Sequence, residues 1–283
     1  MKPFDLPRRV VRSVQTGILN LLVLMLVLFA VFPLFWLIVS SLKLPAELYK
    51  FPVTLIPHNV SWQFYKIVLT LTYFPRYFAN SLLVALGTTM LTTTVAAMGA
   101  YSMVRYQHWL SDFLARAILF AYLFPRILLV IPFFILLLQI GLVNTRTGLI
   151  ASHVVFTLPF ALWFLVGYFK TIPREIEEAA RIDGASNVTI FLRIVLPLAR
   201  PGLVAAAIFT FINSWNEFLF ALVLTTAKEV QTISVGLYGL VGGETMEWGQ
   251  MLAASTLVIL PVLFFFLLIQ RHLAEGLTGG AGR

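Results

Sequence analysis

Ionisable side chains, the usual carriers of catalytic and binding chemistry, are scarce in this chain, and one stretch between long apolar segments is rich in them. Only 11% of its 283 residues are Asp, Glu, Lys or Arg. The segment 170–200, here called the charged loop, holds five Lys/Arg and four Asp/Glu, and long apolar segments flank it on both sides. Because so many charges must lie in water, we expect the charged loop to be a surface where another molecule docks.

Motifs that would make the chain an enzyme do not occur in the sequence. It has no HExxH zinc motif, no GxSxG nucleophile motif and no paired carboxylates. It also lacks the phosphate-binding loop G-x-x-x-x-G-K-[ST], so any ATP would be bound by another protein. An embedded enzyme would need a constellation around His153, for which we instead predict a hydrogen bond between packed helices. We expect no catalytic residue, no cofactor and no metal ion.

Composition indicates that the rest of the chain lies in a lipid bilayer. Hydrophobic residues make up 60% of it, and its mean hydropathy is +0.92, far above the range of soluble domains. Backbone groups in hydrocarbon must be paired within the segment, and the apolar runs are long rather than alternating. Cysteine is absent, which excludes disulfides and thiolate metal sites. We predict an all-α polytopic membrane protein.

Six windows are long enough to cross the bilayer, which takes about 20 mostly apolar residues. Two of them carry one internal charge each, Arg126 in the third and Glu217 in the fifth. One such charge costs about 3 kcal/mol, which the surrounding Leu, Ile and Phe can offset. The predicted transmembrane helices are 18–42, 77–104, 117–140, 147–169, 201–227 and 248–270.

The distribution of Lys and Arg predicts the orientation, because cytoplasmic segments carry the excess of these residues. With both ends inside, thirteen lie in cytoplasmic segments, six in outer segments and one in the membrane. This orientation makes 1–17 a cytoplasmic arm, 43–76 an extracytoplasmic loop with short helices, and 271–283 a cytoplasmic tail. The core, 77–270, then presents the charged loop to the cytoplasm.

Helix start and stop signals divide the charged loop into two short helices lying at the membrane surface. The first should begin near a capping Thr and a Pro and end near Ile182, where Gly184 permits a positive backbone dihedral. The second should follow a capping Ser or Asn and stop before the fifth span. The signals are Thr171, Pro173, Gly184, Ser186 or Asn187, Pro197 and Pro201.

The charged loop also matches a known signature at every fixed position: E-A-A, three residues, G, nine residues, I, one residue, L-P. This pattern resembles the coupling loop of the permease subunits of ATP-binding-cassette (ABC) importers. The residues concerned are Glu178, Ala179, Ala180, Asp183, Gly184, Ile194, Leu196 and Pro197.

Weaker matches extend the resemblance over nearly the whole chain and are typical of the carbohydrate-uptake branch, in particular the second permease of maltose-type systems. They are Ser41-Leu42-Lys43 with Glu47, Asn80-Ser81, Ala100-Tyr101 with Arg105, Trp215-Asn216-Glu217-Phe218, and Glu275-Gly276-Leu277-Thr278 with Gly279 and Gly280. Arg126 departs from the pattern, since a small or neutral residue is expected there.

The resemblance implies a type I ABC importer transmembrane domain in the cytoplasmic (inner) membrane. Such a chain works with a second homologous permease, with a homodimer or heterodimer of ATPase subunits, and with an extracytoplasmic sugar-binding protein. In this family the charged loop docks on the ATPase, where the glutamate that matches Glu178 pairs with a basic residue. The segment from Glu275 to Arg283 is implied to contact the ATPase as well.

Several polar residues near the centre of the membrane admit two interpretations. Aromatic rings and amides suit sugars, so they could line the sugar path; equally, they could hold helices together by hydrogen bonds. We also expect that Arg126 could pair with Glu217. The residues are Arg126, Asn213, Trp215, Asn216 and Glu217.

The cargo suggested by the resemblance is a disaccharide or oligosaccharide, with a polyol or glycerol phosphate as alternatives. A different class of transporter, an ion-coupled carrier, would use Glu217 or Arg126 as its charge relay. Such a carrier usually has broken helices in paired halves and would not need the charged loop.

Overall fold

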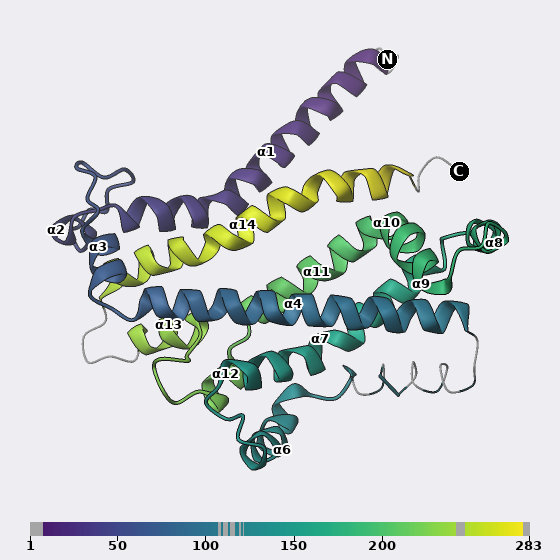
Figure 1. Ribbon diagram of the computed structural model, residues 1–283. Helices are drawn as coiled ribbons and strands as arrows, with labels where there is room; N and C mark the ends of the chain where they lie inside the picture. The colour runs from purple at the N-terminus through teal and green to yellow at the C-terminus, as the bar shows by residue number, and fades with distance from the viewer. Residues whose placement is uncertain are drawn as a thin grey trace. The chain divides into compact units, whose positions relative to one another are not determined.

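A computed structural model shows that the chain is helical (Figure 1). The structure describes residues 8–106, 109, 113, 117–118, 120, 122–241 and 247–279, and side chains within this set except those of 8–14, 241 and 268–279. None of the described residues forms a strand. The helices are α1 (Arg8–Ser41), α2 (Pro45–Leu48), α3 (Gln63–Thr70), α4 (Phe74–Arg105), α6 (Arg126–Gln139), α7 (Arg146–Phe169), α8 (Arg174–Ile182), α9 (Asn187–Ile190), a π-helical turn η1 (Phe191–Val195), α10 (Leu196–Leu198), α11 (Arg200–Trp215), α12 (Leu219–Leu224), α13 (Ile233–Val241) and α14 (Trp248–Gly279).

Four of the described helices contain a segment long and apolar enough to cross a membrane. These segments are Gln15–Ser41, Phe74–Arg105, Arg146–Phe169 and Trp248–Leu267. They overlap the first, second, fourth and sixth predicted spans. The third predicted span is represented by the 14-residue α6, and two residues in the rest of its window, 119 and 121, lie outside the described set.

The fifth predicted span, 201–227, is not one helix. It consists of α11 and α12, separated by the non-helical residues Asn216 to Phe218. At its other end, α11 meets the segment Asn187–Leu198 at an angle of 76°. The first break was not predicted, because neither Gly nor Pro, the usual helix breakers, occurs there.

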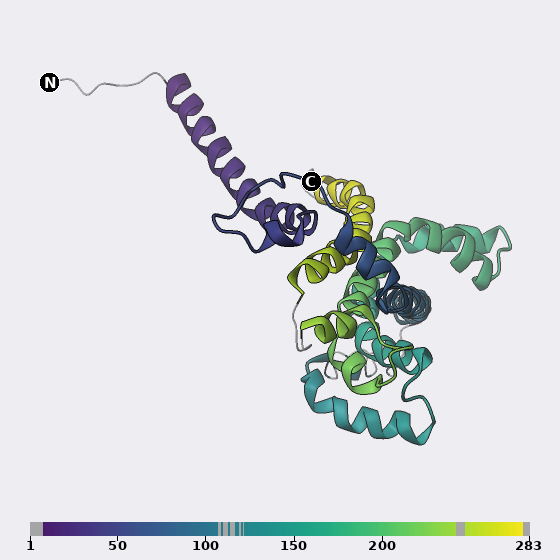
Figure 2. The same cartoon turned by 90° about the vertical axis from the view of Figure 1, so that its left-hand side faces the viewer.

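The chain divides into two compact units, residues 1–71 with 245–257, and residues 72–244 with 258–283. In the second unit α4 packs along both α7 and α11, which also contact each other. Figure 2, which looks nearly along the axis of α4, shows α7 and α11 beside it. These three helices form the frame on which the charged loop is built.

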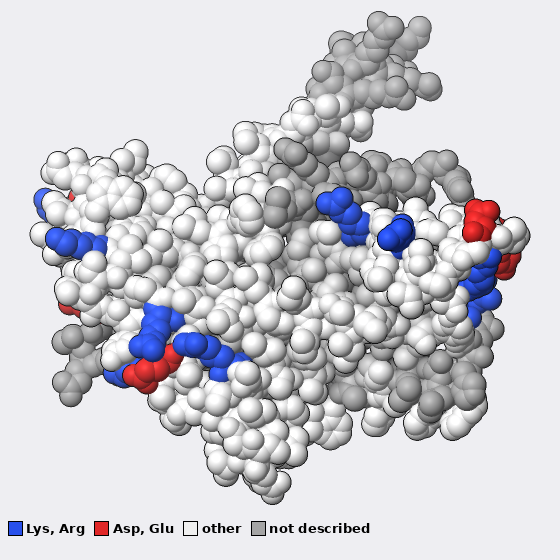
Figure 3. Space-filling model, in the orientation of Figure 1, with Lys and Arg blue, Asp and Glu red and all other residues white. Residues whose placement is uncertain are grey.

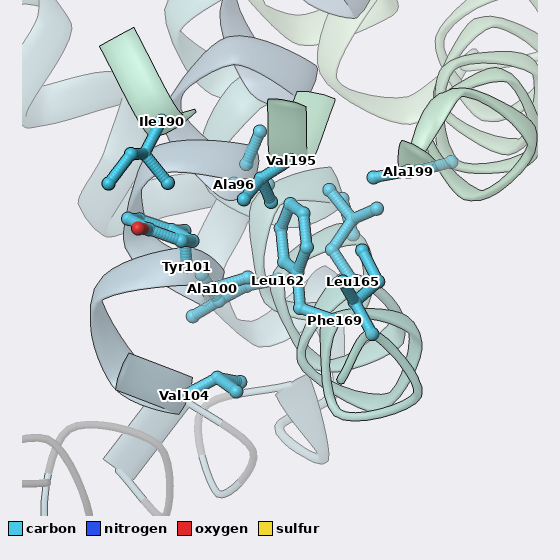
Figure 4. Packing of buried hydrophobic residues seen from close by; sticks show 14 residues of the cluster. Ala96, Ala100, Tyr101, Val104, Leu162, Leu165, Phe169, Ile190, Val195 and Ala199 are labelled. Carbon is cyan, nitrogen blue, oxygen red and sulfur yellow. The ribbon is translucent and has the colours of Figure 1, made fainter. Parts of the chain in front are cut away.

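Two apolar clusters lie at opposite parts of this bundle. One surrounds the base of the charged loop and joins small residues of α4 to apolar side chains of α7, α9 and η1 (Figure 4). Its small members are Ala96, Ala97 and Ala100, and small residues let helices approach closely. The other cluster joins Val84 of α4 to residues of α6, α7, α12 and α13.

Most charged side chains of the second unit that Figure 3 shows lie near the two ends of α4. Figure 3 shows one group over α8 to α11 and another near the start of α4, with a largely uncharged surface between them. A bilayer-spanning protein has this distribution, because the charges lie where water reaches them.

In the first unit, residues 43–62 lead from α1 to α3 by irregular backbone that contains the short helix α2, as the sequence predicted for the region between the first two spans. The buried Lys43, only 1% exposed, donates from Nζ to the carbonyl of Thr54 at 2.6 Å. Glu47 accepts from the hydroxyl of Thr54 and from the backbone N–H of His58. These contacts fix a segment that lacks regular structure.

Candidate functional site

The charged loop begins with α8, whose start differs slightly from the prediction. Pro173, in extended conformation, immediately precedes the helix. Thr171 does not cap it, because its hydroxyl donates back to the carbonyl of Tyr168 at 2.7 Å. Acidic Glu175 and Glu177 lie in the first turn and basic Arg181 lies in the last, which complements the helix dipole. The helix ends at Ile182 as predicted.

The turn after α8 follows the predicted signals. Gly184 has φ of +84°, a left-handed conformation that is nearly free of strain only for glycine. Its N–H donates to the carbonyl of Arg181, and Ala185 N–H donates to that of Ala180, which closes the end of α8. Ser186 then caps α9, since its hydroxyl accepts from the backbone N–H of Thr189 at 3.2 Å.

The second helical piece continues further than the sequence suggested. It runs from Asn187 through the π-helical turn η1 and α10 to Leu198. Pro197 therefore lies inside a helical stretch rather than ending it. The wider π turn ends at Val195, two residues before this proline, which has no backbone N–H to donate. The chain bends at Ala199 instead, and Pro201 lies in the first turn of α11.

Glu177 is the one buried residue of α8, although it is charged. Its side chain is 2% exposed, and its Oε1 accepts from Arg105 Nε at 2.5 Å. Its Oε2 accepts from the hydroxyl of Tyr101 at 2.8 Å. Both partners lie on α4, so this carboxylate fastens the charged loop to the end of that helix.

Glu178, the residue of the signature, is exposed. The part of the chain that the structure describes offers its carboxylate no hydrogen bond or ion pair, so it is available to another molecule. Ala179 and Asp183 are exposed beside it, and Ile182 is 87% exposed. This combination of a free carboxylate, a small residue and an apolar side chain is suited to contact with a protein.

The other signature residues support this surface from behind. Ala180, Ile194 and Leu196 are half-buried and pack against the apolar cluster at the base of the loop. Pro197 is exposed. The signature thus contains residues facing outward on α8 and residues that attach the loop to the bundle.

The polar residues proposed for the centre of the membrane do not all come together. A cavity of about 410 Å³ is lined by Arg126, Asn213, Asn216, Glu217 and four apolar or aromatic side chains, Ile212, Phe218, Leu219 and Phe220. Trp215 does not line it. Its ring is 1% exposed and stacks on Phe211 with centroids 5.7 Å apart.

The expected pairing of Arg126 with Glu217 is wrong. Glu217 Oε2 lies 3.3 Å from Nε2 of His153, and Nδ1 of the same ring lies 2.7 Å from the hydroxyl of Ser214. The backbone N–H groups of Phe220 and Ala221 donate to the two Glu217 oxygens. Glu217 therefore caps the start of α12 and holds it to α7 through His153.

Arg126 has a different neighbour. It begins α6, where its guanidinium carbon lies 5.8 Å from the centre of the Phe156 ring, within range of a cation–π interaction. The side chain is exposed and also borders the cavity. Asn213, on the other wall, donates from Nδ2 to the carbonyl of Phe209 one turn earlier in α11.

The role of Glu177 was not apparent from the sequence, in which Arg181, four residues later on the same helix face, is a possible local partner. That pair is weak, with atoms 4.0 Å apart and Arg181 half exposed. The available signal was the spacing of Tyr101 and Arg105, four residues apart and therefore on one face of a helix. Nothing in the spacing indicated which acidic residue they would meet.

Relatives and solved structures resemble the chain over most of its length. It is 34% identical over 262 residues to the trehalose/maltose transport system permease protein MalG of Thermococcus litoralis, covering 91% of this chain and 93% of the relative. It is 33% identical over 255 residues to the diacetylchitobiose uptake system permease protein NgcG of Streptomyces coelicolor, covering 89% and 83%.

The fold resembles a chain in the crystal structure of a bacterial ABC transporter involved in the import of the acidic polysaccharide alginate. The TM-score is 0.80 at 23% identity, with 95% of this chain and 99% of that chain covered. Residues 89–279, which include the charged loop, match the family of binding-protein-dependent transport system inner membrane components. This chain belongs to that family.

Proposed function

We propose that this chain is the membrane-spanning permease subunit of an ATP-driven ABC importer that carries a disaccharide or oligosaccharide across the cytoplasmic membrane. Relatives named as trehalose/maltose and diacetylchitobiose permeases support a sugar as cargo. ATP hydrolysis belongs to separate ATPase subunits. A second homologous permease and an extracytoplasmic sugar-binding protein complete the transporter.

The observation that carries this proposal is the contrast between two adjacent glutamates on α8. Glu177 is buried and bound to α4, so the helix is fixed to the bundle. Glu178 is exposed and free to bind a basic group of the ATPase. A rigid helix with an available charge can convert closure of an ATPase dimer into movement of the spans, as alternating access requires.

The topology belonging to this proposal has six spans and cytoplasmic termini. α1, α4, α7 and α14 provide the first, second, fourth and sixth spans. α6 belongs to the third, and α11 with α12 forms a broken fifth. The domain division keeps the arm 1–17, the outer loop 43–76, the core 77–270 with its coupling loop 170–200, and the tail 271–283.

The cavity beside α11 and α12 is our candidate for part of the sugar path. Asn213 and Asn216 offer amides for hydroxyl groups, Phe218 offers an aromatic face, and Arg126 adds hydrogen-bond donors. Trp215 and Glu217 act mainly through helix packing, the first by stacking and the second by capping α12.

The ion-coupled alternative receives little support from the geometry. A charge relay needs a group that can exchange its partner, but the Glu217 oxygens already accept from two backbone N–H groups and lie beside His153. Arg126 forms no ion pair with the described residues, so it does not provide a second site for a charge relay.

The class of transport is tested with the full complex in liposomes. The probes are maltose and trehalose, with a neutral polyol and glycerol phosphate as the alternative cargoes. We expect uptake of a sugar that requires ATP and binding protein and continues when an ionophore collapses ion gradients. Uptake that continues without ATP but stops with the ionophore would instead identify an ion-coupled carrier.

A further inference from the structure

Hydrogen bonds between α4 and the charged loop are donated from both sides. α4 donates to the charged loop from the Tyr101 hydroxyl and from Arg105, whose Nη2 also reaches the carbonyl of Ile172 at 3.1 Å. In return, Arg174 at the start of α8 donates from Nη2 to the carbonyl of Val104 at 2.9 Å. We call this reciprocal set, formed by Tyr101, Val104, Arg105, Ile172, Arg174 and Glu177, the α4–α8 clamp.

Aromatic and apolar side chains pack around Tyr101, a member of the clamp. The Tyr101 ring lies 6.2 Å from that of Phe169 and 4.8 Å from that of Phe191, measured between centroids. Figure 4 shows Tyr101 between Ile190 and the small and apolar side chains of α4 and α7. The same tyrosine thus contributes a hydrogen bond to α8 and ring contacts to α7 and η1.

Burial makes the clamp difficult to open. The side chains of Arg105 and Glu177 are 6% and 2% exposed. Separating α8 from α4 would leave two charges without a partner in a site that water barely reaches, which is strongly unfavourable. A movement that keeps the pair together therefore costs far less than one that divides it.

The opposite end of α4 holds a second set of hydrogen bonds. Asn80 donates from Nδ2 to the carbonyls of Glu229 and Gln231, both at 2.9 Å, and its Oδ1 accepts from Arg146 Nε at 2.8 Å. Ser81 accepts from the backbone N–H of Ile233 at 2.8 Å. α4 is thus fixed at its other end to the segment between α12 and α13.

We propose that α4 and α8 move as one rigid body, and that α4 transmits a displacement of α8 to the segment 229–233 at its far end. This inference rests on the proposed function, in which the ATPase acts on α8. It assigns Glu177, Arg105 and Asn80 as positioning residues. The route through α4 adds to the direct connection of the charged loop to α7 and α11, the helices that flank it in the chain.

The absence of cysteine from the chain permits a direct test of rigidity. Spin labels are placed on Glu175→Cys of α8 and Met98→Cys of α4, two exposed positions. The distance distribution between them is measured in the full complex, without nucleotide and with ATP bound. We expect one narrow distribution that is the same in both states. A shift of its maximum on ATP binding would overturn the proposal.

The variant Glu177→Gln tests the clamp itself; in the unlabelled protein, Glu175→Gln on the exposed side of the same helix is the matched control for uptake and ATP hydrolysis. We expect Glu177→Gln to broaden the label distribution and lower ATP-driven uptake roughly tenfold, while basal ATP hydrolysis stays near that of the control. Equal uptake in the two variants would overturn the proposal. If Glu177→Gln does not fold, the label distances measured with the intact clamp, without nucleotide and with ATP, decide whether α4 and α8 move together.

Failure of the proposed function and failure of the clamp can be told apart by these measurements. A complex that shows no ATP-dependent uptake would refute the importer assignment, but the labels would still report on rigidity in the membrane. A narrow distribution with Glu177 intact that broadens in Glu177→Gln supports the clamp. Equal widths in the two proteins overturn it.

Discussion

Glu177 and Glu178 are consecutive residues of one helix, yet the first is buried against α4 and the second faces away from the bundle. The buried carboxylate binds Tyr101 and Arg105 of the same chain. The exposed one is left for another molecule. Because successive residues of a helix point about 100° apart, a single turn can both attach α8 to the bundle and present a charge on its surface.

The cap of α12 provides a stability prediction. Glu217→Ala removes the acceptor of two backbone N–H groups and leaves His153 without its carboxylate neighbour. We expect the free energy of unfolding to fall by about 2 kcal/mol, the usual cost of losing a helix cap or a hydrogen bond to a charged group. Thermal unfolding in detergent measures this change. The control is Glu229→Ala, whose side chain is exposed, and an equal effect of the two substitutions would contradict the capping role.

A close approach of α11 to α7 provides a second prediction. A Cβ at Gly202 would lie 2.5 Å from Cγ of the Tyr168 ring, whereas a Cβ at Gly167 would meet nothing within 4 Å. Gly202→Ala should therefore destabilise the protein by about 1–3 kcal/mol, as overpacking does. Gly167→Ala should be neutral or stabilising by up to about 1 kcal/mol. Melting temperatures of the two variants, compared with wild type, test the packing.

The segment 43–62 should respond to acid. A hydrogen bond from the His58 side chain, with further donors from the His58 backbone and Thr54, lowers the pKa of Glu47 from 4.5 to about 2. Because the pKa is lower in the folded state, the carboxylate stabilises the folded segment above about pH 4.5. This stabilisation is lost as the pH falls through about 2.

Hydrogen exchange of the His58 amide, corrected for intrinsic rates, measures this effect. Protection should be constant down to about pH 4.5 and then decline toward pH 2. In Glu47→Gln, protection should be lower at neutral pH and lack this decline. A steady protection from pH 7 to pH 2 in the wild-type protein would contradict the assignment.

The sequence predicted the helical class, the position of the charged loop and the turn at Gly184, because each depends on local signals. Length and hydropathy identify long apolar helices, and glycine at a positive φ angle is a local property. The signature also singled out Glu178, whose exposure the structure shows. These features can be read from a few neighbouring residues.

Features that depend on contacts distant in the sequence were not predicted. Glu177 meets Arg105 and Tyr101 across 72 and 76 residues, and no spacing rule links such positions. The pairing of Glu217 with His153 rather than Arg126 depends on how α7 and α11 pack. The break of the fifth predicted span at residues 216–218 arises because the Glu217 side chain caps a new helix there, which composition does not reveal.

Charge reversal at Glu178 tests the central claim, that α8 couples this permease to an ATPase, most directly. Glu178→Lys and the control Glu175→Lys are each reconstituted with the partner permease, ATPase and binding protein, and ATP-driven sugar uptake is measured. We expect Glu178→Lys to lower uptake roughly tenfold or more, because a cation would then face the basic group that our proposal places on the ATPase, and Glu175→Lys to retain it. Uptake by Glu178→Lys equal to that of the control would contradict the claim.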